Sequence, residues 1–88
     1  MNVEFKKSFE KDLSKIRDKD LLAKIKAVIE AVERATSLSE INNLKKLKVE
    51  GNYYRIRISN HRVGIIESEG VISFVRVLDR KEMYRYFP

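Results

Sequence analysis

The spacing of apolar residues changes once along this chain, at Gly51-Asn52, and no other feature constrains the fold as strongly. Before this point apolar residues recur every three or four positions, which is typical of helices with one buried face. After it they alternate with polar residues, which is typical of strands with one buried face. The sequence therefore predicts an α+β fold in which helices come first and most strands follow.

Two helices are expected in the N-terminal part. The first has apolar residues at intervals of four, four and three: Phe5, Phe9, Leu13 and Ile16. The second has its apolar face between Leu21 and Val32, and Asp18 or Asp20 can cap its N-terminus. Because only residues 17–20 separate the two helices, we expect them to form a hairpin.

Shorter elements are expected on either side of this hairpin. Residues 2–5 can form a short edge strand. Ser37 and Glu40 have the spacing of a capping box, which indicates that a short third helical turn begins there. The apolar residues of this turn are Leu38, Ile41, Leu44 and Leu47.

Three strands are expected after the change of period, over residues 53–59, 62–67 and 71–78. The turns between them are short, so consecutive strands should pair antiparallel. The predicted order is β-α-α-β-β-β: an antiparallel sheet with the N-terminal helical hairpin packed on one face. Residues 79–86 are too polar for a core strand and should form a short helical turn or a tail.

Length and composition narrow the class of protein. With 88 residues, the chain should form a single domain over residues 1–88. It has no cysteine and one histidine, so we expect no disulfide, metal site or cofactor. No apolar stretch reaches the ~18–20 residues of a membrane span, and no secretory leader is recognisable. A cytoplasmic location is therefore expected.

The charge favours a polyanionic partner, with nucleic acid the first candidate. The chain has 19 Lys and Arg against 13 Asp and Glu, a net charge of +6. The basic residues are mostly lysine before Gly51 and mostly arginine after it. A guanidinium binds phosphate oxygens in a bidentate manner, whereas an ammonium is a solvated point charge. We therefore expect an oxyanion site in the C-terminal part.

Five residues of this part are candidates for such a site. On the first predicted strand after Gly51, alternation places Arg55 and Arg57 opposite the apolar side chains, and Arg62 can approach them across the next turn. Arg80 and Tyr84 become neighbours if residues 79–86 are helical, an arrangement that suits a phosphate on the guanidinium and a base on the ring. The alternatives are a solvated sheet face and a chain end that merely packs on the core.

Two further side chains need an explanation. Arg76 shares a predicted strand face with Phe74, so its charge requires a partner, for which Asp79 or Glu67 is expected. His61 is the only histidine and is either a catalytic group or an exposed turn residue. The sequence has no Ser-His-Asp set, glycine-rich phosphate loop or metal-ligand spacing, so any chemistry should be metal-free.

Three strings resemble the RelE/ParE superfamily of toxins from type II toxin–antitoxin pairs: YRIRI over 54–58, Arg62-Val63 and DRKEMYR over 79–85. With the two N-terminal helices, the resemblance covers nearly the whole chain. It implies a RelE-like microbial ribonuclease-type fold and, for the RelE-like branch, cleavage of messenger RNA in the ribosomal A site, which inhibits translation. In that reaction the 2′-OH of the scissile nucleotide attacks the adjacent phosphate without a metal. A cognate antitoxin is the implied partner.

The resemblance also assigns roles to residues. Arg55 and Arg57 match a basic pair that holds RNA and steadies the phosphate, and Arg62 matches an arginine at the scissile phosphate. Arg80 matches the arginine assigned to transition-state charge or to the leaving group, and Tyr84 the aromatic that stacks on or orients the nucleotide. The predicted catalytic residues are thus Arg57, Arg62, Arg80 and Tyr84. The predicted RNA-binding residues are Arg55, Arg57, Lys81 and Arg85.

Two positions depart from the superfamily pattern. Many relatives have His-Arg where this chain has Asp79-Arg80, and many have tyrosine where His61 stands. The identity of the general base therefore stays open. His61 or Glu50 can take this role, or a base is dispensable when the ribosome orders the substrate.

Two alternative functions fit the same sequence. A ParE-like toxin would inhibit DNA gyrase by binding it, without catalysis. A basic α+β module would bind RNA or the ribosome and cut nothing. Gyrase-directed relatives generally lack the complete set of arginines plus tyrosine, and this favours the ribonuclease.

Overall fold

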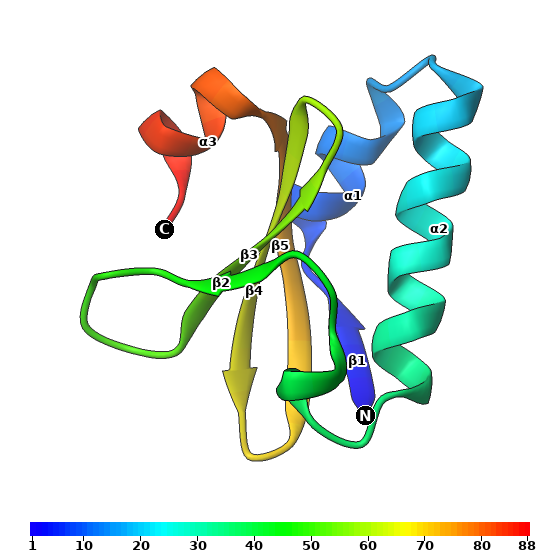
Figure 1. The fold of residues 1–88 in the computed structure, drawn as a ribbon. Coiled ribbons are helices and arrows are strands. Elements are labelled where there is room, and N and C mark those ends of the chain that lie inside the picture. The colour runs from blue at the N-terminus through cyan, green and yellow to red at the C-terminus, as the bar shows by residue number, and fades with distance from the viewer.

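The structure is a computed structural model that describes residues 1–88. It contains three α-helices and one five-stranded sheet (Figure 1). In chain order the elements are β1 (Asn2–Phe5), α1 (Lys7–Ser14), α2 (Lys19–Arg34), a 3₁₀ turn (Leu38–Glu40), β2 (Leu44–Lys46), β3 (Tyr53–Ile58), β4 (His61–Ser68), β5 (Val71–Asp79) and α3 (Arg80–Tyr86). The predicted α+β class is confirmed.

The sheet has the strand order β1-β5-β4-β3-β2 and is mixed. β1 pairs with β5 in parallel, with Val3 opposite Ile72, whereas all other neighbours pair antiparallel. The prediction of a purely antiparallel sheet is therefore wrong at the β1 edge. Alternation along a strand reports which face is buried, but it reports neither the direction of the strand nor its neighbour.

The segment between α2 and β3 also differs from the prediction. The capping box of Ser37 and Glu40 is present, but it opens only one 3₁₀ turn. Asn43 has a φ of 63°, a left-handed conformation that stops a helix, and Leu44–Lys46 then pairs with β3 as the edge strand β2. The apolar spacing here fits a helical turn or a strand, and backbone pairing with β3 decides between them.

α1 is shorter than the predicted helix. Phe5 belongs to β1, and the N–H of Lys6 still donates to the carbonyl of Phe74 at 2.9 Å, so the helix begins only at Lys7. α2 begins after Asp18, whose carboxylate accepts the N–H groups of the next turn at 2.9 and 3.2 Å, one of the two caps predicted.

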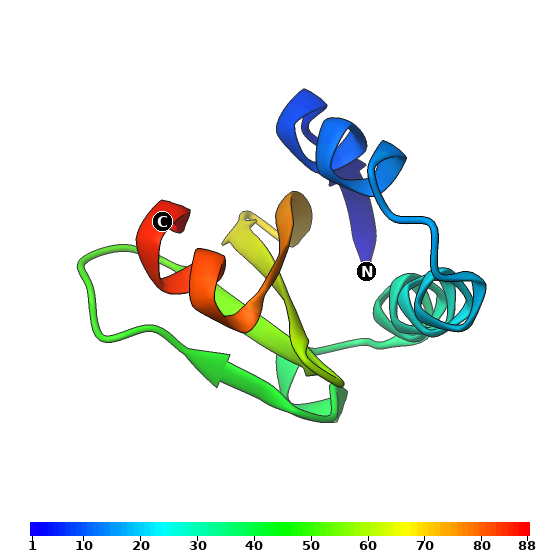
Figure 2. The same cartoon turned by 90° about the horizontal axis from the view of Figure 1, so that it is seen from above.

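The main core lies between one face of the sheet and the helices α1 and α2. Its buried side chains are Phe9, Leu21, Ile25, Val32, Ile56, Ile58, Val63, Ile65, Ile72, Phe74 and Val77. Figure 2 shows α2 and α3 on opposite sides of the sheet. The second face of the sheet therefore carries α3 and the polar side chains of the alternating strands. None of the helices has the length and apolar content that a membrane crossing requires.

A β-bulge in β5 changes which residues share a face. Ile65 pairs with Phe74 but Gly64 pairs with Arg76, so one residue of β5, Val75, has no partner on β4. Phe74 and Val77 are consequently both buried in the core, and Arg76 is not. The predicted common face of Arg76 and Phe74 is wrong for this reason.

Arg76 forms an ion pair with Asp12 of α1. Its Nε and Nη2 donate to the two carboxylate oxygens at 2.7 and 3.0 Å, and the N–H of Val77 donates to the same carboxylate at 3.1 Å. Asp12 is buried, and the Arg76 guanidinium lies 5.9 Å from the ring centroid of Tyr86. The prediction of Asp79 or Glu67 as the partner is wrong, because the bulge turns the side chain toward α1 at the end of the sheet.

Candidate functional site

The candidate site lies on the sheet face that carries α3. Arg57 and Arg62 are direct partners across β3 and β4, and Arg55 is two residues from Arg57 on the same strand. Residues directly opposed in an antiparallel pair share a face, as do residues two apart along a strand. The two-residue turn Ser59-Asn60, with Ser59 at a φ of 53°, sets this register. The three arginines therefore share one face.

Arg62 is the buried member of this group, only 9% exposed. Its Nη1 donates to the carbonyls of Ser59 and His61 at 3.1 and 2.9 Å, which fixes the guanidinium beside the turn. Its other two guanidinium nitrogens donate to no group of the chain. A buried guanidinium with fixed geometry and unused donors is suited to binding an oxyanion.

Charges from three elements act on Arg62. Burial lowers its pKa, the positive charges of Arg55, Arg80 and Arg57 lower it further, and Tyr84 acts in the opposite direction. These residues come from β3 and α3, the two elements that the strand pairing and the hydrogen bond from Arg80 to Asn60 place next to Arg62. Because arginine stays protonated in proteins, the cluster is permanently positive, and binding an anion relieves the repulsion among its charges. We call these five residues the arginine cluster.

α3 brings Arg80 and Tyr84 to this face. The N–H of Arg80 donates to the carbonyl of Asn60 at 2.8 Å, so the helix begins beside the turn that precedes Arg62. Tyr84 is 74% exposed, and Lys81 and Arg85 are exposed on the same helix. Of the two alternatives predicted for residues 79–86, the helical one is confirmed.

Asp79 is the N-cap of α3. Its Oδ1 accepts the N–H of Glu82 at 3.0 Å. This hydrogen bond first, and then the backbone of Lys81 and the charge of His61, hold the pKa of Asp79 below its usual range. The residue that stands where a histidine is common in the superfamily therefore starts the helix that carries Arg80.

We expect Asp79→Ala to weaken the packing of α3 at neutral pH and to have little effect in acid. A carboxyl whose pKa is lowered on folding stabilises the folded state above its unfolded pKa, and this contribution is lost as the pH falls through the folded value. The difference in Tm between wild type and Asp79→Ala should therefore shrink as the pH falls below about 4, the usual pKa of an aspartate. Asp79→Asn retains a capping side chain and should lie between the two. An equal difference at pH 7 and pH 3 would contradict this role.

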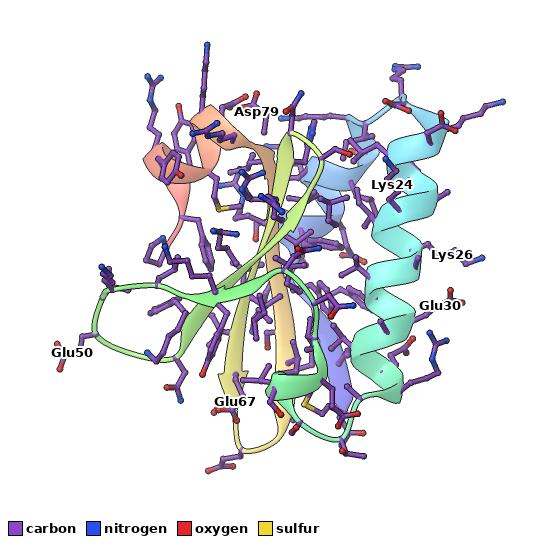
Figure 3. The ribbon with its side chains drawn as sticks, viewed as in Figure 1. Lys24, Lys26, Glu30, Glu50, Glu67 and Asp79 are labelled. Carbon is purple, nitrogen blue, oxygen red and sulfur yellow. The ribbon has the colours of Figure 1, made fainter.

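The two candidate bases lie apart from the arginine cluster. His61 is opposite Ile58, so its side chain is on the core side of β4, where it lines a surface cavity of about 270 Å³ with residues of α1 and α3. Glu50 is exposed in the loop between β2 and β3, and Figure 3 shows it pointing away from the protein. Neither is among the charges that shift the pKa of Arg62. No group of His, Cys, Asp or Glu side chains comes together that can hold a metal ion.

Two residues that make structural contacts over long distances leave no clear signal in the sequence. Asn60 acts through its carbonyl, and a backbone role leaves no mark in the type of side chain. Asp12 lies 64 positions from Arg76, and nothing in the local pattern connects the two. The only signal is that Asp12 borders the apolar stripe of α1, where a carboxylate requires a partner.

Comparisons with known proteins agree with this architecture. A family model described as the ParE toxin of the type II toxin–antitoxin system parDE matches residues 3–84. Toxin RelE3 of Methanocaldococcus jannaschii is 43% identical over 89 residues, which cover 100% of both chains. The chain therefore belongs to the RelE/ParE superfamily of toxins and is a RelE-like toxin of a toxin–antitoxin system.

Solved structures show the same fold. A chain of the RelB–RelE antitoxin–toxin complex from Methanococcus jannaschii matches with a TM-score of 0.82 and 42% identity, over 96% of this chain and 98% of that one. YafQ from E. coli matches with a TM-score of 0.76 over 94% and 97% of the two chains. Because YafQ shares only 13% identity with this chain, its likeness concerns the fold alone.

Proposed function

We propose that this toxin is a ribosome-dependent endoribonuclease that cleaves messenger RNA in the ribosomal A site. The observation that carries the proposal is that Arg55 and Arg57 share a sheet face with the buried Arg62, and that α3 begins with Arg80 beside the turn before Arg62. A positive charge held in fixed geometry, as that of Arg62 is by two carbonyls, is worth most where negative charge develops during a reaction. Cleavage of a phosphodiester develops such charge on the non-bridging oxygens of the phosphate.

The proposed reaction is an attack by the substrate's own 2′-oxygen. The bond from this oxygen to phosphorus forms, the bond from phosphorus to the 5′-oxygen breaks, and a 2′,3′-cyclic phosphate and a 5′-hydroxyl result. Water accepts the proton of the 2′-OH and supplies one to the 5′-oxygen. Arg62 and Arg57 stabilise the charge on the phosphate, Arg80 stabilises the leaving oxygen, and Tyr84 stacks on the nucleotide.

We assign the proton transfers to neither His61 nor Glu50. His61 lies on the core side of the sheet, and Glu50 points away from the protein in the loop between β2 and β3. Alignment of the 2′-oxygen with the phosphate, imposed when the ribosome holds the message, supplies much of the rate. Orientation of this kind accounts for several kcal/mol of a typical barrier, about 7–11 in well-aligned cases.

The proposed partners are translated messenger RNA and a cognate antitoxin. The similar toxin from Methanococcus jannaschii was crystallised as an antitoxin–toxin complex. In this chain a surface cavity of about 270 Å³ between α2 and the segment before β2 is lined by apolar side chains of both and by Arg57. An apolar antitoxin helix docked there would lie on the α2 side of the sheet, next to the strand that carries Arg57. A toxin with this substrate would act in the cytoplasm.

Expression of the wild-type toxin, followed by primer extension on a translated message, tests the proposal. New message ends that appear only during translation would support it. The family match to the ParE toxin favours a second candidate, inhibition of DNA gyrase without catalysis. Inhibition of supercoiling by the purified protein, with all messages intact, would replace the first proposal by the second.

RNA binding should depend steeply on salt, and the arginines of β3 should carry part of this dependence. The slope of log K against log salt is about −0.7 for each phosphate neutralised on a single strand. Arg55→Ala/Arg57→Ala should therefore reduce the slope by about 1.4 in a titration of unstructured RNA. Lys26→Ala/Arg34→Ala removes the same charge from α2, on the other side of the sheet, and should retain the wild-type slope (Figure 3). Equal slopes for the two double variants would show that the arginines of β3 contribute no more to the salt dependence than the basic residues of α2.

A further inference from the structure

α3 is attached to the sheet by few side chains. Met83 and Phe87, the residue that follows the helix, are 4% and 7% exposed, whereas all other residues of α3 are exposed. The helix has seven residues, and isolated helices shorter than about 12 residues are barely stable in water. The position of α3 on the sheet therefore depends on how these two side chains fit.

Gly64 provides the surface on which Phe87 packs. It lies within β4, opposite Arg55 on β3 and Arg76 on β5. A Cβ atom at position 64 would lie 2.8 Å from three atoms of the Phe87 ring, well inside the ~3.5 Å of ordinary carbon contacts. The ring of Tyr53 meets the Phe87 ring edge-on, with centroids 5.8 Å apart. The close approach of a ring gives a physical reason for a glycine in a strand, which otherwise weakens the strand.

Strain in the backbone is not the reason for this glycine. Of the three glycines, only Gly51 and Gly70 have positive φ angles. An alanine at position 64 is therefore excluded by the Phe87 ring and not by the conformation of the chain. Without the ring, the exchange of Gly64 for alanine would be neutral or stabilising, because alanine restricts the unfolded chain.

We propose that the Phe87 ring, seated on Gly64, sets the position of α3 and thereby places Arg80 and Tyr84 beside Arg62. Gly64 and Phe87 are positioning residues, since they act on the arginine cluster only through α3. They hold the C-terminal end of the helix, whereas the Asp79 cap and the hydrogen bond from Arg80 to Asn60 hold its N-terminal end. The expected effect on cleavage rests on the proposed function, but the placement of α3 does not.

Gly64→Ala tests this inference without touching any residue of the cluster. The added methyl group must displace the ring by about 0.7 Å to reach ordinary contact distance. A misplacement of about 1 Å can cost up to ~100-fold in rate, so we expect cleavage of translated message to fall at least about tenfold. Amide hydrogen exchange in α3 should rise at least about tenfold, with the main core still protected.

Phe87→Leu should restore the cleavage that Gly64→Ala removes. Phe87→Leu in the Gly64→Ala protein shortens the side chain that meets the new methyl group, and cleavage should return to within about threefold of Phe87→Leu alone. Ile65→Val is the matched control, because Ile65 is the next residue of β4 and is buried on the opposite face. It weakens the main core but should leave cleavage within about twofold of wild type.

Three results would overturn the inference: wild-type exchange in α3 of Gly64→Ala, absence of rescue by Phe87→Leu, or an equal loss of cleavage in Ile65→Val. If the wild-type toxin cuts no message, the proposed function fails. The hydrogen exchange of α3 in Gly64→Ala and in the double variant then still decides whether Phe87 on Gly64 positions the helix.

Discussion

Arg62→Ala is expected to lower the rate of message cleavage by a factor of about 10²–10³, the usual cost of removing one preorganised donor from a developing oxyanion. Arg62 is the central group because it is buried, held by two carbonyls and surrounded by the other members of the arginine cluster. Its loss should lower the rate at saturating ribosomes more than it weakens binding. Single-turnover cleavage of a message on stalled ribosomes measures both quantities.

Two further variants distinguish the role of the Arg62 donors from that of positive charge in general. Arg62→Lys retains the charge but not the fork of donors, and it should recover at most a small part of the rate. Arg34→Ala removes an exposed arginine at the end of α2 and should cleave like wild type. A rate for Arg62→Ala within threefold of wild type, in protein with an unchanged Tm, would exclude Arg62 from the reaction.

Asp12→Ala is expected to lower the free energy of unfolding by about 2–4 kcal/mol. Removing one partner of a buried ion pair leaves an uncompensated charge, which typically costs about 3–5 kcal/mol. The Arg76 side chain retains 27% exposure, so water compensates for part of this cost. The N–H of Val77 also loses its acceptor. For a domain of this size the corresponding fall in Tm is roughly 4–8 °C for each kcal/mol.

The control for this prediction is Glu10→Ala, which removes an exposed carboxylate from the same helix. It should change the free energy of unfolding by no more than about 0.5 kcal/mol. Urea unfolding of both variants measures the difference. If Asp12→Ala and Glu10→Ala unfold at the same urea concentration, the ion pair with Arg76 contributes no net stability.

Much of the fold was predictable because local patterns report burial. The change of period at Gly51 separates the helices from strands β3 to β5, and the caps at Asp18 and Ser37 lie where the sequence indicates. What the patterns do not report is pairing over long distances. The parallel contact of β1 with β5 and the conversion of residues 44–46 into an edge strand depend on backbone hydrogen bonds to distant residues.

The arginines of the candidate site were predictable for the same reason, and the features that position them were not. Alternation alone places Arg55 and Arg57 on one face, and a two-residue turn brings Arg62 opposite Arg57. The unpaired residue of β5 shifts Arg76 off the predicted face, and a one-residue shift of this kind has no sequence signature. The contact of Phe87 with Gly64 is likewise visible only in three dimensions.

In the proposed function, the arginine cluster promotes attack by the 2′-oxygen of a message held on the ribosome. The most direct test uses ribosomes programmed with two messages that differ by one 2′-O-methyl group at the A-site cleavage position. Purified toxin should cut the unmodified message, leave a 2′,3′-cyclic phosphate on the upstream fragment and spare the methylated message. Equal cutting of both messages, or cutting of neither by toxin that inhibits DNA gyrase, would contradict the proposal.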